Sequence, residues 1–187
     1  MTSDNGNLGS NGTLRVAAAQ VNTSVGDIDG NAMLIEKWIG LAQDQGADLV
    51  AFPELTITGY PPEDLVLYDN FIAANKAALN RIASSVGDIV AVVGFVDSEE
   101  TPTGTKLFNA AAVLHNHKVI TTYRKIHLPN YGVFDERRYF TPGSECPVLS
   151  INGIKVGINI CEDIWEQIGP SEVQCANGAQ IIVNINS

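Results

Sequence analysis

The stretch KVGINICEDIW, Lys155 to Trp165, decides how this chain is interpreted. Apolar side chains alternate with small or polar residues up to Ile160, which is the pattern of a strand with one buried face. Cys161 follows directly, and an acidic, helix-prone run comes next. Parallel α/β sheets place their chemistry at the carboxyl ends of strands, so Cys161 is a candidate nucleophile. On this stretch alone, a small buried core cysteine fits equally well.

Two other polar residues follow predicted strands. Glu54 comes after the apolar run 48–52 and Pro53, and a proline ends a strand because it has no N–H to donate. Lys125 follows the run 119–124. With Cys161 they can supply a nucleophile, a base and an oxyanion stabiliser, and we expect Lys125 to favour the thiolate. The alternative is a core thiol, a solvated lysine and a strand-end carboxylate.

Apolar runs predict the strands of the chain. We expect strands at residues 14–21, 48–52, 89–96, 108–114, 119–124, 147–151, 154–160 and 180–185. A polar loop is predicted for 98–106, and hairpin turns are predicted at 115–118 and at Asn152-Gly153, a strong hairpin dipeptide.

Three helical segments are predicted between these strands. The first follows the turn 26–30, ends at Gly46, and carries an apolar stripe of Leu34, Trp38 and Leu41 beside a second of Ile35, Ile39 and Ala42. The second is capped by Asn70 and closed by Gly87, and the third runs from Cys161 to Gly178. The mixture of alternating and hairpin-joined elements predicts a layered α/β domain with mixed sheets.

Composition narrows the class of protein. The 187 residues suit one domain, which we place at 13–187 after a disordered tail at 1–12 that is rich in Ser, Asn and Gly. The net charge of -10 argues against binding to nucleic-acid phosphates or to anionic membrane surfaces. The chain has no apolar run of membrane-spanning length and no secretory signal pattern, so we expect a cytoplasmic protein.

Cofactor and metal motifs are lacking in the sequence. The three cysteines have no CxxC spacing, so Cys146 and Cys175 are interpreted as structural. His115 and His117 fall at a predicted polar hairpin tip and are interpreted as an exposed turn, not as metal ligands. No GxGxxG or Walker A sequence occurs, so we expect no cofactor in this domain.

Three segments carry a resemblance to a known family. Residues 52–55 (FPEL), 123–129 (YRKIHLP) and 160–165 (ICEDIW) resemble the signature segments of the nitrilase, or carbon–nitrogen hydrolase, superfamily, in the family's order. The resemblance runs from about Leu14 to Ser187. It implies a nitrilase-like α-β-β-α sandwich with mixed sheets and a Glu54–Lys125–Cys161 triad. In such a triad the cysteine forms a thioester, the glutamate acts as the base and the lysine stabilises the oxyanion.

Two further stretches resemble one branch of this superfamily. Residues 55–65 and 129–140 are similar to the N-terminal glutaminase domains of glutamine-dependent NAD synthetases. This similarity implies that L-glutamine is the substrate, with Tyr60 and Tyr131 lining its pocket and Glu136 orienting Lys125. It also implies that the ammonia passes to an ATP-dependent ligase domain, which alone needs ATP and magnesium. A homo-oligomer is expected for the full-length protein.

The same resemblance implies further strands and the ligase domain after Ser187. We therefore expect the domain to be C-terminally incomplete, and unstable or inactive when taken alone. Two alternatives stay open. One is a stand-alone amidase or carbamoylase of the same superfamily, and the other is a non-catalytic interaction domain on that scaffold. The presence of all three triad residues argues against the second alternative.

Overall fold

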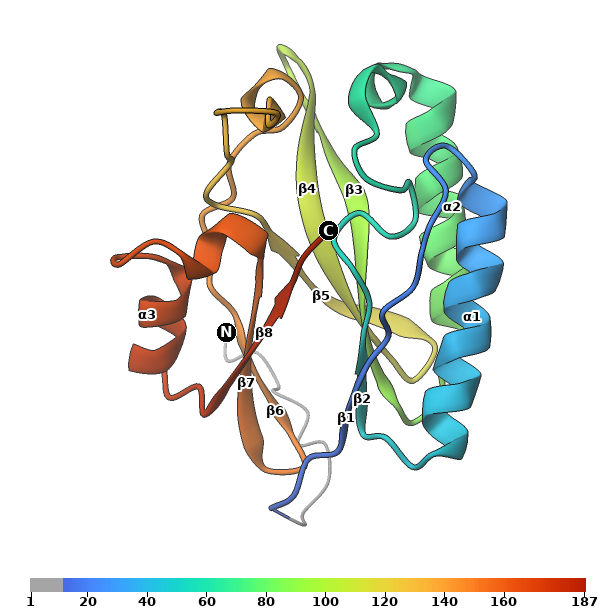
Figure 1. Ribbon diagram of the computed structural model, residues 1–187, viewed down its shortest axis with the longest axis vertical. Helices are drawn as coiled ribbons and strands as arrows, with labels where there is room; N and C mark the ends of the chain where they lie inside the picture. Colours follow the sequence, from blue (N-terminus) through green and yellow to red (C-terminus); the bar gives the residue numbers. More distant parts are fainter. Residues whose placement is uncertain (1–11) are drawn as a thin grey trace.

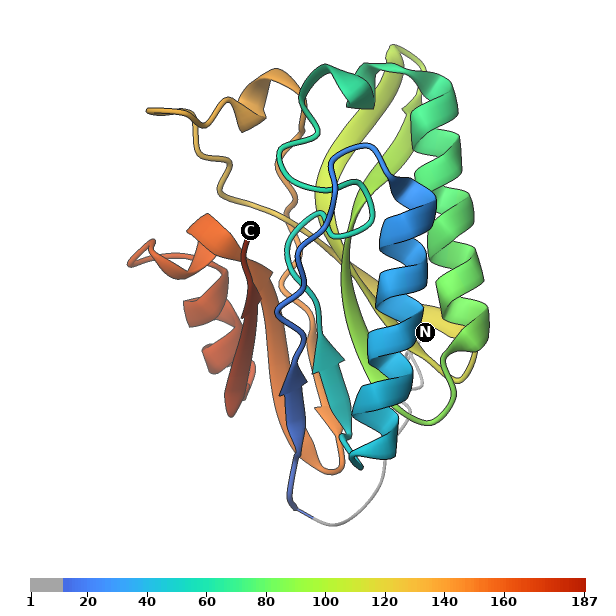
Figure 2. The same ribbon diagram turned by 45° about the vertical axis from the view of Figure 1, so that its right-hand side comes forward.

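Two sheets packed face to face form the centre of the molecule, and helices cover both outer faces. The computed structural model describes residues 12–187, so nearly all of the predicted tail at 1–12 lies outside the described residues. Figure 1 shows the four layers side by side, and Figure 2 shows the same order after a rotation. The predicted α-β-β-α sandwich is therefore confirmed. No helix within residues 12–187 is long and apolar enough to cross a membrane.

The larger sheet contains the first five strands in sequence order. They are β1 (Val16–Ala18), β2 (Leu49–Ala51), β3 (Val90–Thr101), β4 (Gly104–His115) and β5 (Lys118–Arg124). β1, β2 and β3 run parallel, whereas β3, β4 and β5 pair antiparallel. Antiparallel neighbours can be joined by short hairpins, which explains why helices connect only the first three strands.

The smaller sheet contains β6 (Val148–Ile151), β7 (Ile154–Ile160) and β8 (Ile181–Ile185). β6 and β7 pair antiparallel through the turn at Asn152 and Gly153, whose φ angles are 50 and 80 degrees. Asparagine and glycine tolerate this left-handed geometry, which matches the twist of a hairpin, so the predicted turn is confirmed. β7 and β8 are parallel, and the segment after Cys161 crosses between them.

Helices α1 (Ile28–Asp44) and α2 (Asp69–Ser85) cover the outer face of the larger sheet, and α3 (Pro170–Ala176) covers the smaller one (Figure 1). Short 3₁₀ helices lie at Glu63–Leu67, Glu136–Arg138 and Cys161–Ile164. The prediction of one helix from Cys161 to Gly178 was therefore wrong. Pro170 begins α3 because it needs no hydrogen bond to its nitrogen at a first helical position.

Two helix details also differ from prediction. On α1 the buried stripe is the one with Ile35, Ile39 and Ala42, whereas Trp38 is 38% exposed and Leu41 is 44% exposed. The helix therefore packs the stripe of Ile35, Ile39 and Ala42 against the sheet and leaves Trp38 and Leu41 at the surface. α2 begins at Asp69, so Asn70 lies inside it and does not cap it.

The predicted polar loop at 98–106 is instead the end of a long hairpin. Glu99 pairs with Lys106 across the β3–β4 ladder, and the Thr105 hydroxyl donates to Glu100. The end of β3 and the start of β4 extend into solvent, so their side chains are polar on both faces. Backbone pairing and cross-strand polar contacts then hold the strands without the apolar alternation that sequence patterns rely on.

The space between the sheets is filled by apolar side chains from both. Val92 and Val113 of the larger sheet meet Val156, Ile158 and Ile160 of the smaller one in one buried cluster. Each fully buried aliphatic side chain contributes roughly 1.5–3 kcal/mol through removal of apolar surface from water. This core fixes the two sheets relative to each other, and thereby the residues that follow their strands.

Gly94 of β3 allows the chain after β2 to cross close to the sheet. A Cβ at this position would lie 2.4 Å from both the Leu55 nitrogen and the Pro53 oxygen. We expect Gly94→Ala to destabilise the fold by about 1–3 kcal/mol, as overpacking does. The displaced segment carries Glu54. Urea unfolding checks the effect on stability.

Gly40 of α1 provides the matched control. A Cβ there would meet no described atom within 4 Å. Gly40→Ala should therefore stabilise the protein by about 0.5–1 kcal/mol, as alanine does in a helix interior. Equal stability of wild type and Gly94→Ala would contradict the close crossing.

Candidate active site

Three strand ends from the two sheets meet around one buried cluster. Glu54 follows β2 at the turn where Leu55 takes a φ of 49 degrees. Lys125 follows β5, and its backbone nitrogen donates to the Asn109 oxygen of β4 at 2.8 Å. Cys161 directly follows β7 and itself has a φ of 45 degrees. Each of the three candidate residues therefore comes from a different strand end.

Lys125 forms a buried ion-pair network with two carboxylates. Its Nζ lies 2.7 Å from Glu54 Oε1 and 2.8 Å from Glu136 Oε1. The Lys125 side chain is fully buried and both acids are nearly so. Burial opposes the ammonium, but the charges of Glu54 and Glu136 outweigh it, so the pKa of Lys125 is raised. Lys125 is therefore a fixed positive charge inside the protein.

Asn109 is the residue of this network that the sequence analysis missed. Its Nδ2 donates to Glu54 Oε1 at 2.7 Å and to Glu136 Oε2 at 3.3 Å. The signal in the sequence was a single amide within an otherwise apolar strand, between Phe108 and Ala110. A buried polar side chain at such a position needs partners, and here the partners are the two acids.

Two buried polar atoms in this cluster have no hydrogen-bond partner among the described residues. They are Glu54 Oε2 and Asn109 Oδ1. The Cys161 thiol therefore does not donate to Glu54 in this geometry. A buried acceptor without a donor costs about 1–3 kcal/mol. Glu54 Oε2 is accordingly a strong acceptor that is open to a proton.

The electrostatics of Cys161 differ from the expected thiolate. Burial, followed by the charge of Glu54, raises the pKa of Cys161 to about 11, and the opposing effect of Lys125 is smaller. Lys125 does favour the thiolate, as expected, because its charge lowers the pKa of Cys161, but burial and the charge of Glu54 outweigh it. Cys161 is a neutral thiol near pH 7 and needs a base to become a nucleophile.

Asp163 holds the segment around Cys161 in place. Its buried carboxylate accepts from the Ile160 nitrogen at 3.1 Å, the Tyr123 hydroxyl at 2.6 Å and the His127 nitrogen at 2.8 Å. These bonds tie the end of β7 to β5 and to the segment after Lys125. A left-handed backbone at a residue with a side chain is strained, and the bonds of Asp163 stabilise that geometry at Cys161.

A cavity of about 410 Å³ adjoins the ion-pair network. Tyr60, Glu136 and Phe140 are among the residues that line it. The Tyr60 hydroxyl lies 3.4 Å from Glu136 Oε1, and burial, followed by the charge of Glu136, raises the pKa of Tyr60. The structure thus brings Tyr60 and Glu136 together beside Glu54 and Lys125.

Tyr131 lies apart from that cavity. Its side chain is 58% exposed, and its hydroxyl donates to Glu162 Oε2 at 2.8 Å. Tyr131 and Glu162 line a second hollow of about 320 Å³ together with His127. Because Glu162 follows Cys161 directly, Tyr131 remains next to the cysteine segment but at its solvent side.

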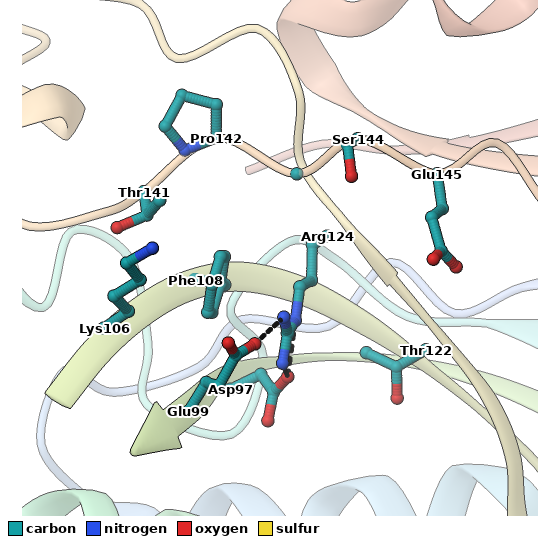
Figure 3. A pocket seen from close by; sticks show the side chains of 11 residues that line it. Asp97, Glu99, Lys106, Phe108, Thr122, Arg124, Thr141, Pro142, Ser144 and Glu145 are labelled. Atoms are coloured by element: carbon teal, nitrogen blue, oxygen red, sulfur yellow. Dashed lines mark hydrogen bonds and ion pairs between the residues drawn. The ribbon is translucent and has the colours of Figure 1, made fainter. Parts of the chain in front are cut away.

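A larger cavity of about 500 Å³ lies elsewhere, along β3, β4 and β5. Figure 3 shows Arg124 between Asp97 and Glu99, with ion-pair distances of 2.8 and 2.6 Å, and its guanidinium lies 3.8 Å over the Phe108 ring. The arginine is fully engaged by these partners, and no cysteine lines the cavity. None of Glu54, Lys125 and Glu136 lines it either, so it is not the candidate active site.

Within residues 12–187, no group of three or more His, Cys, Asp or Glu side chains could hold a metal ion. His117 lies on the exposed turn as predicted, with Nδ1 2.8 Å from the Ser84 oxygen. His115 is buried, contrary to prediction, because it ends β4 beside Ile89.

Comparison with known proteins gives consistent matches. The profile of the carbon-nitrogen hydrolase family matches residues 15–187. The glutamine-dependent NAD(+) synthetase of Thermotoga maritima is 44% identical over 177 residues, which cover 93% of this chain and 30% of that protein. The chain thus spans about 30% of the length of this curated relative.

Comparison with solved structures gives matches of the same kind. The structure of the glutamine-dependent NAD+ synthetase from Acinetobacter baumannii matches this chain with a TM-score of 0.86 at 40% identity. The match covers 93% of this chain and 32% of the synthetase chain. An amidase from Nesterenkonia sp. has a TM-score of 0.76 at 26% identity, over 92% of this chain and 64% of the amidase.

Proposed function

Because this chain belongs to the carbon–nitrogen hydrolase family, we propose that it hydrolyses the side-chain amide of L-glutamine and releases ammonia. The observation that carries the proposal is the buried Glu54–Lys125 ion pair at the strand ends that adjoin Cys161. It supplies a base and a fixed positive charge beside a neutral thiol. The similarity to glutamine-dependent NAD(+) synthetases selects glutamine among amide substrates.

In the first half of the reaction, Glu54 Oε2 takes the thiol proton as Cys161 Sγ attacks the amide carbon. The carbon–sulfur bond forms, and Lys125 stabilises the negative charge that develops on the amide oxygen. The carbon–nitrogen bond then breaks, and Glu54 returns the proton to the leaving nitrogen. The products are ammonia and a thioester on Cys161. Proton transfer is necessary because a thiol with a pKa near 11 is almost entirely protonated at neutral pH.

In the second half, Glu54 deprotonates a water molecule that attacks the thioester carbon. The carbon–oxygen bond forms, the carbon–sulfur bond breaks, and the proton returns through Glu54 to the sulfur. Glutamate leaves and the enzyme is restored. No cofactor takes part, because a thiol, a carboxylate and an ammonium provide every proton and charge that the steps require.

The substrate pocket is assigned to the cavity beside Glu136. In this proposal Tyr60 lines the pocket, whereas Tyr131 lies outside it, in the separate hollow that it shares with Glu162. Glu136 Oε1 lies 2.8 Å from Lys125 Nζ and helps to hold it in place. The positive charge then stays at the position where the amide oxygen becomes negative.

Similarity to the relatives supports a proposed destination for the ammonia. Because the chain spans about 30% of a glutamine-dependent NAD(+) synthetase, we place it as the ammonia-producing part of such a protein. The acceptor would be a ligase domain that uses ATP and magnesium, in a protein that assembles as a homo-oligomer.

A panel of amides tests the proposed substrate. We expect kcat/KM for L-glutamine to exceed that for butyramide or an N-carbamoyl amino acid by at least about 100-fold, because a site built around polar groups rejects substrates that lack them. Ammonia release is measured for each compound. Faster turnover of butyramide or the carbamoyl compound would instead indicate an amidase or carbamoylase. The assay uses the full-length protein, and no turnover of any amide by it would indicate a non-catalytic domain.

A further inference from the structure

Asn109 is fully buried in β4 at the point where the two acids of the network approach each other. Among the described residues it is the one neutral side chain that bonds both Glu54 and Glu136. Tyr60 reaches only Glu136, and Lys125 carries a charge. The amide therefore occupies a position that the triad alone does not explain.

The orientation of the Asn109 amide follows from its partners. Ionised carboxylates only accept hydrogen bonds, so the amide nitrogen and not the amide oxygen must face them. This orientation leaves Asn109 Oδ1 buried without a partner among the described residues. The unpaired oxygen is unfavourable, but the same orientation lets the amide nitrogen donate a hydrogen bond to each acid.

The consequence for Glu54 is an asymmetric carboxylate. Oε1 is held by Lys125 and Asn109, each at 2.7 Å, whereas Oε2 is buried and receives no hydrogen bond from a described residue. We propose that Asn109 is a positioning residue which, with Lys125, fixes Glu54 so that Oε2 accepts the proton of Cys161. The inference rests on the proposed cysteine hydrolase mechanism.

A neutral amide suits this position electrostatically. The charged or titratable groups that face Glu54 are Lys125, Glu136, Cys161 and Tyr60. Burial raises the pKa of Glu136, while the bonds from Lys125 and Asn109 lower it. Removing the amide takes one hydrogen-bond donor from each carboxylate and leaves Glu54 Oε1 held by Lys125 alone.

The first test replaces Asn109 by leucine, which has a similar size and no donor. We expect kcat to fall about 10- to 100-fold, because a misplaced base loses part of its contribution. KM should change by less than about threefold, since Asn109 does not line the cavity. The acid limb of the kcat/KM–pH profile should move up by about one to two pH units, the effect of losing a hydrogen bond to a charged group.

Asn109→Asp separates positioning from packing. Aspartate keeps the shape of asparagine but replaces the donor with a third acid. We expect a shift of the acid limb at least as large as that of Asn109→Leu. A residue that only fills space would instead give a wild-type profile in this variant.

Asn75→Leu is the matched control. Asn75 is also fully buried, and its amide bonds the Val96 oxygen at 2.6 Å and the Val96 nitrogen at 3.2 Å, away from the acids. We expect a comparable loss of thermal stability with an unmoved pH profile. Wild-type kcat and an unmoved acid limb in both Asn109 variants would overturn the inference.

A second readout needs no glutamine. The rate at which iodoacetamide alkylates Cys161, followed by mass spectrometry, should show the same acid limb as the activity profile. Glu54→Gln should abolish that limb, and Asn109→Leu should move it up by the same interval as the activity profile. If glutamine is not hydrolysed while this shift appears, the proposed substrate fails and the inference stands. If glutamine is hydrolysed and the limb stays in place, the inference fails.

Discussion

Replacing Cys161 with alanine is expected to abolish glutamine hydrolysis, with a loss of about 10⁴- to 10⁶-fold in kcat. The thiol forms the covalent intermediate, and the remaining groups cannot substitute for it. Glu54 and Lys125 would still bind and polarise the amide, so a small residual rate over water is expected. The measurement is ammonia release under saturating glutamine.

Cys175→Ala provides the control for this loss. Cys175 is exposed on α3 and takes no part in the network. Its replacement should leave kcat within about twofold of wild type, as surface substitutions usually do. Both variants should melt near the wild-type temperature, since only one sulfur atom is removed. Turnover by Cys161→Ala within tenfold of wild type would show that another group is the nucleophile.

Replacing Lys125 with methionine is expected to damage both the fold and the activity. The change leaves Glu54 and Glu136 buried together without their shared counter-charge. Breaking a buried ion pair from one side costs about 3–5 kcal/mol, which corresponds to a fall of about 6–20 °C in Tm for a chain of this size. Activity should fall at least about 10²- to 10³-fold through loss of oxyanion stabilisation.

Lys76→Met is the control for removal of a lysine charge. Its Nζ lies 3.9 Å from Asp97, and its side chain is 40% exposed. A partly exposed pair of this kind contributes about 0–1 kcal/mol, so Tm and turnover should change little. If Lys125→Met melted like Lys76→Met, the buried network would not stabilise the protein in the manner described.

The sequence was most informative where apolar runs end. The strands that precede Glu54 and Cys161 are short and largely buried, and burial imposes an apolar pattern that can be recognised without a structure, whereas the strand before Lys125 is mostly exposed or half-buried. The residue that follows each run is then placed at a sheet edge by topology. This is why the acid–lysine pair could be expected before its distance of 2.7 Å was known.

Two features of the site could not be predicted because they depend on distant contacts. Asn109 bonds acids that are 55 and 27 positions away in sequence, so only the packed sheets determine its partners. The protonation of Cys161 depends on a balance between burial and three charges. Residue type and spacing indicated that Lys125 favours the thiolate, but they could not show that burial and the charge of Glu54 outweigh it.

The most direct test of the account is to identify which cysteine becomes covalently modified. The protein is incubated with a glutamine analogue that carries an electrophilic ketone in place of the side-chain amide, and its peptides are examined by mass spectrometry. We predict one adduct, on Cys161, formed more slowly in Glu54→Gln and absent from Cys161→Ala. Labelling of Cys146 or Cys175 with Cys161 unmodified would contradict the assignment of Cys161 as the nucleophile.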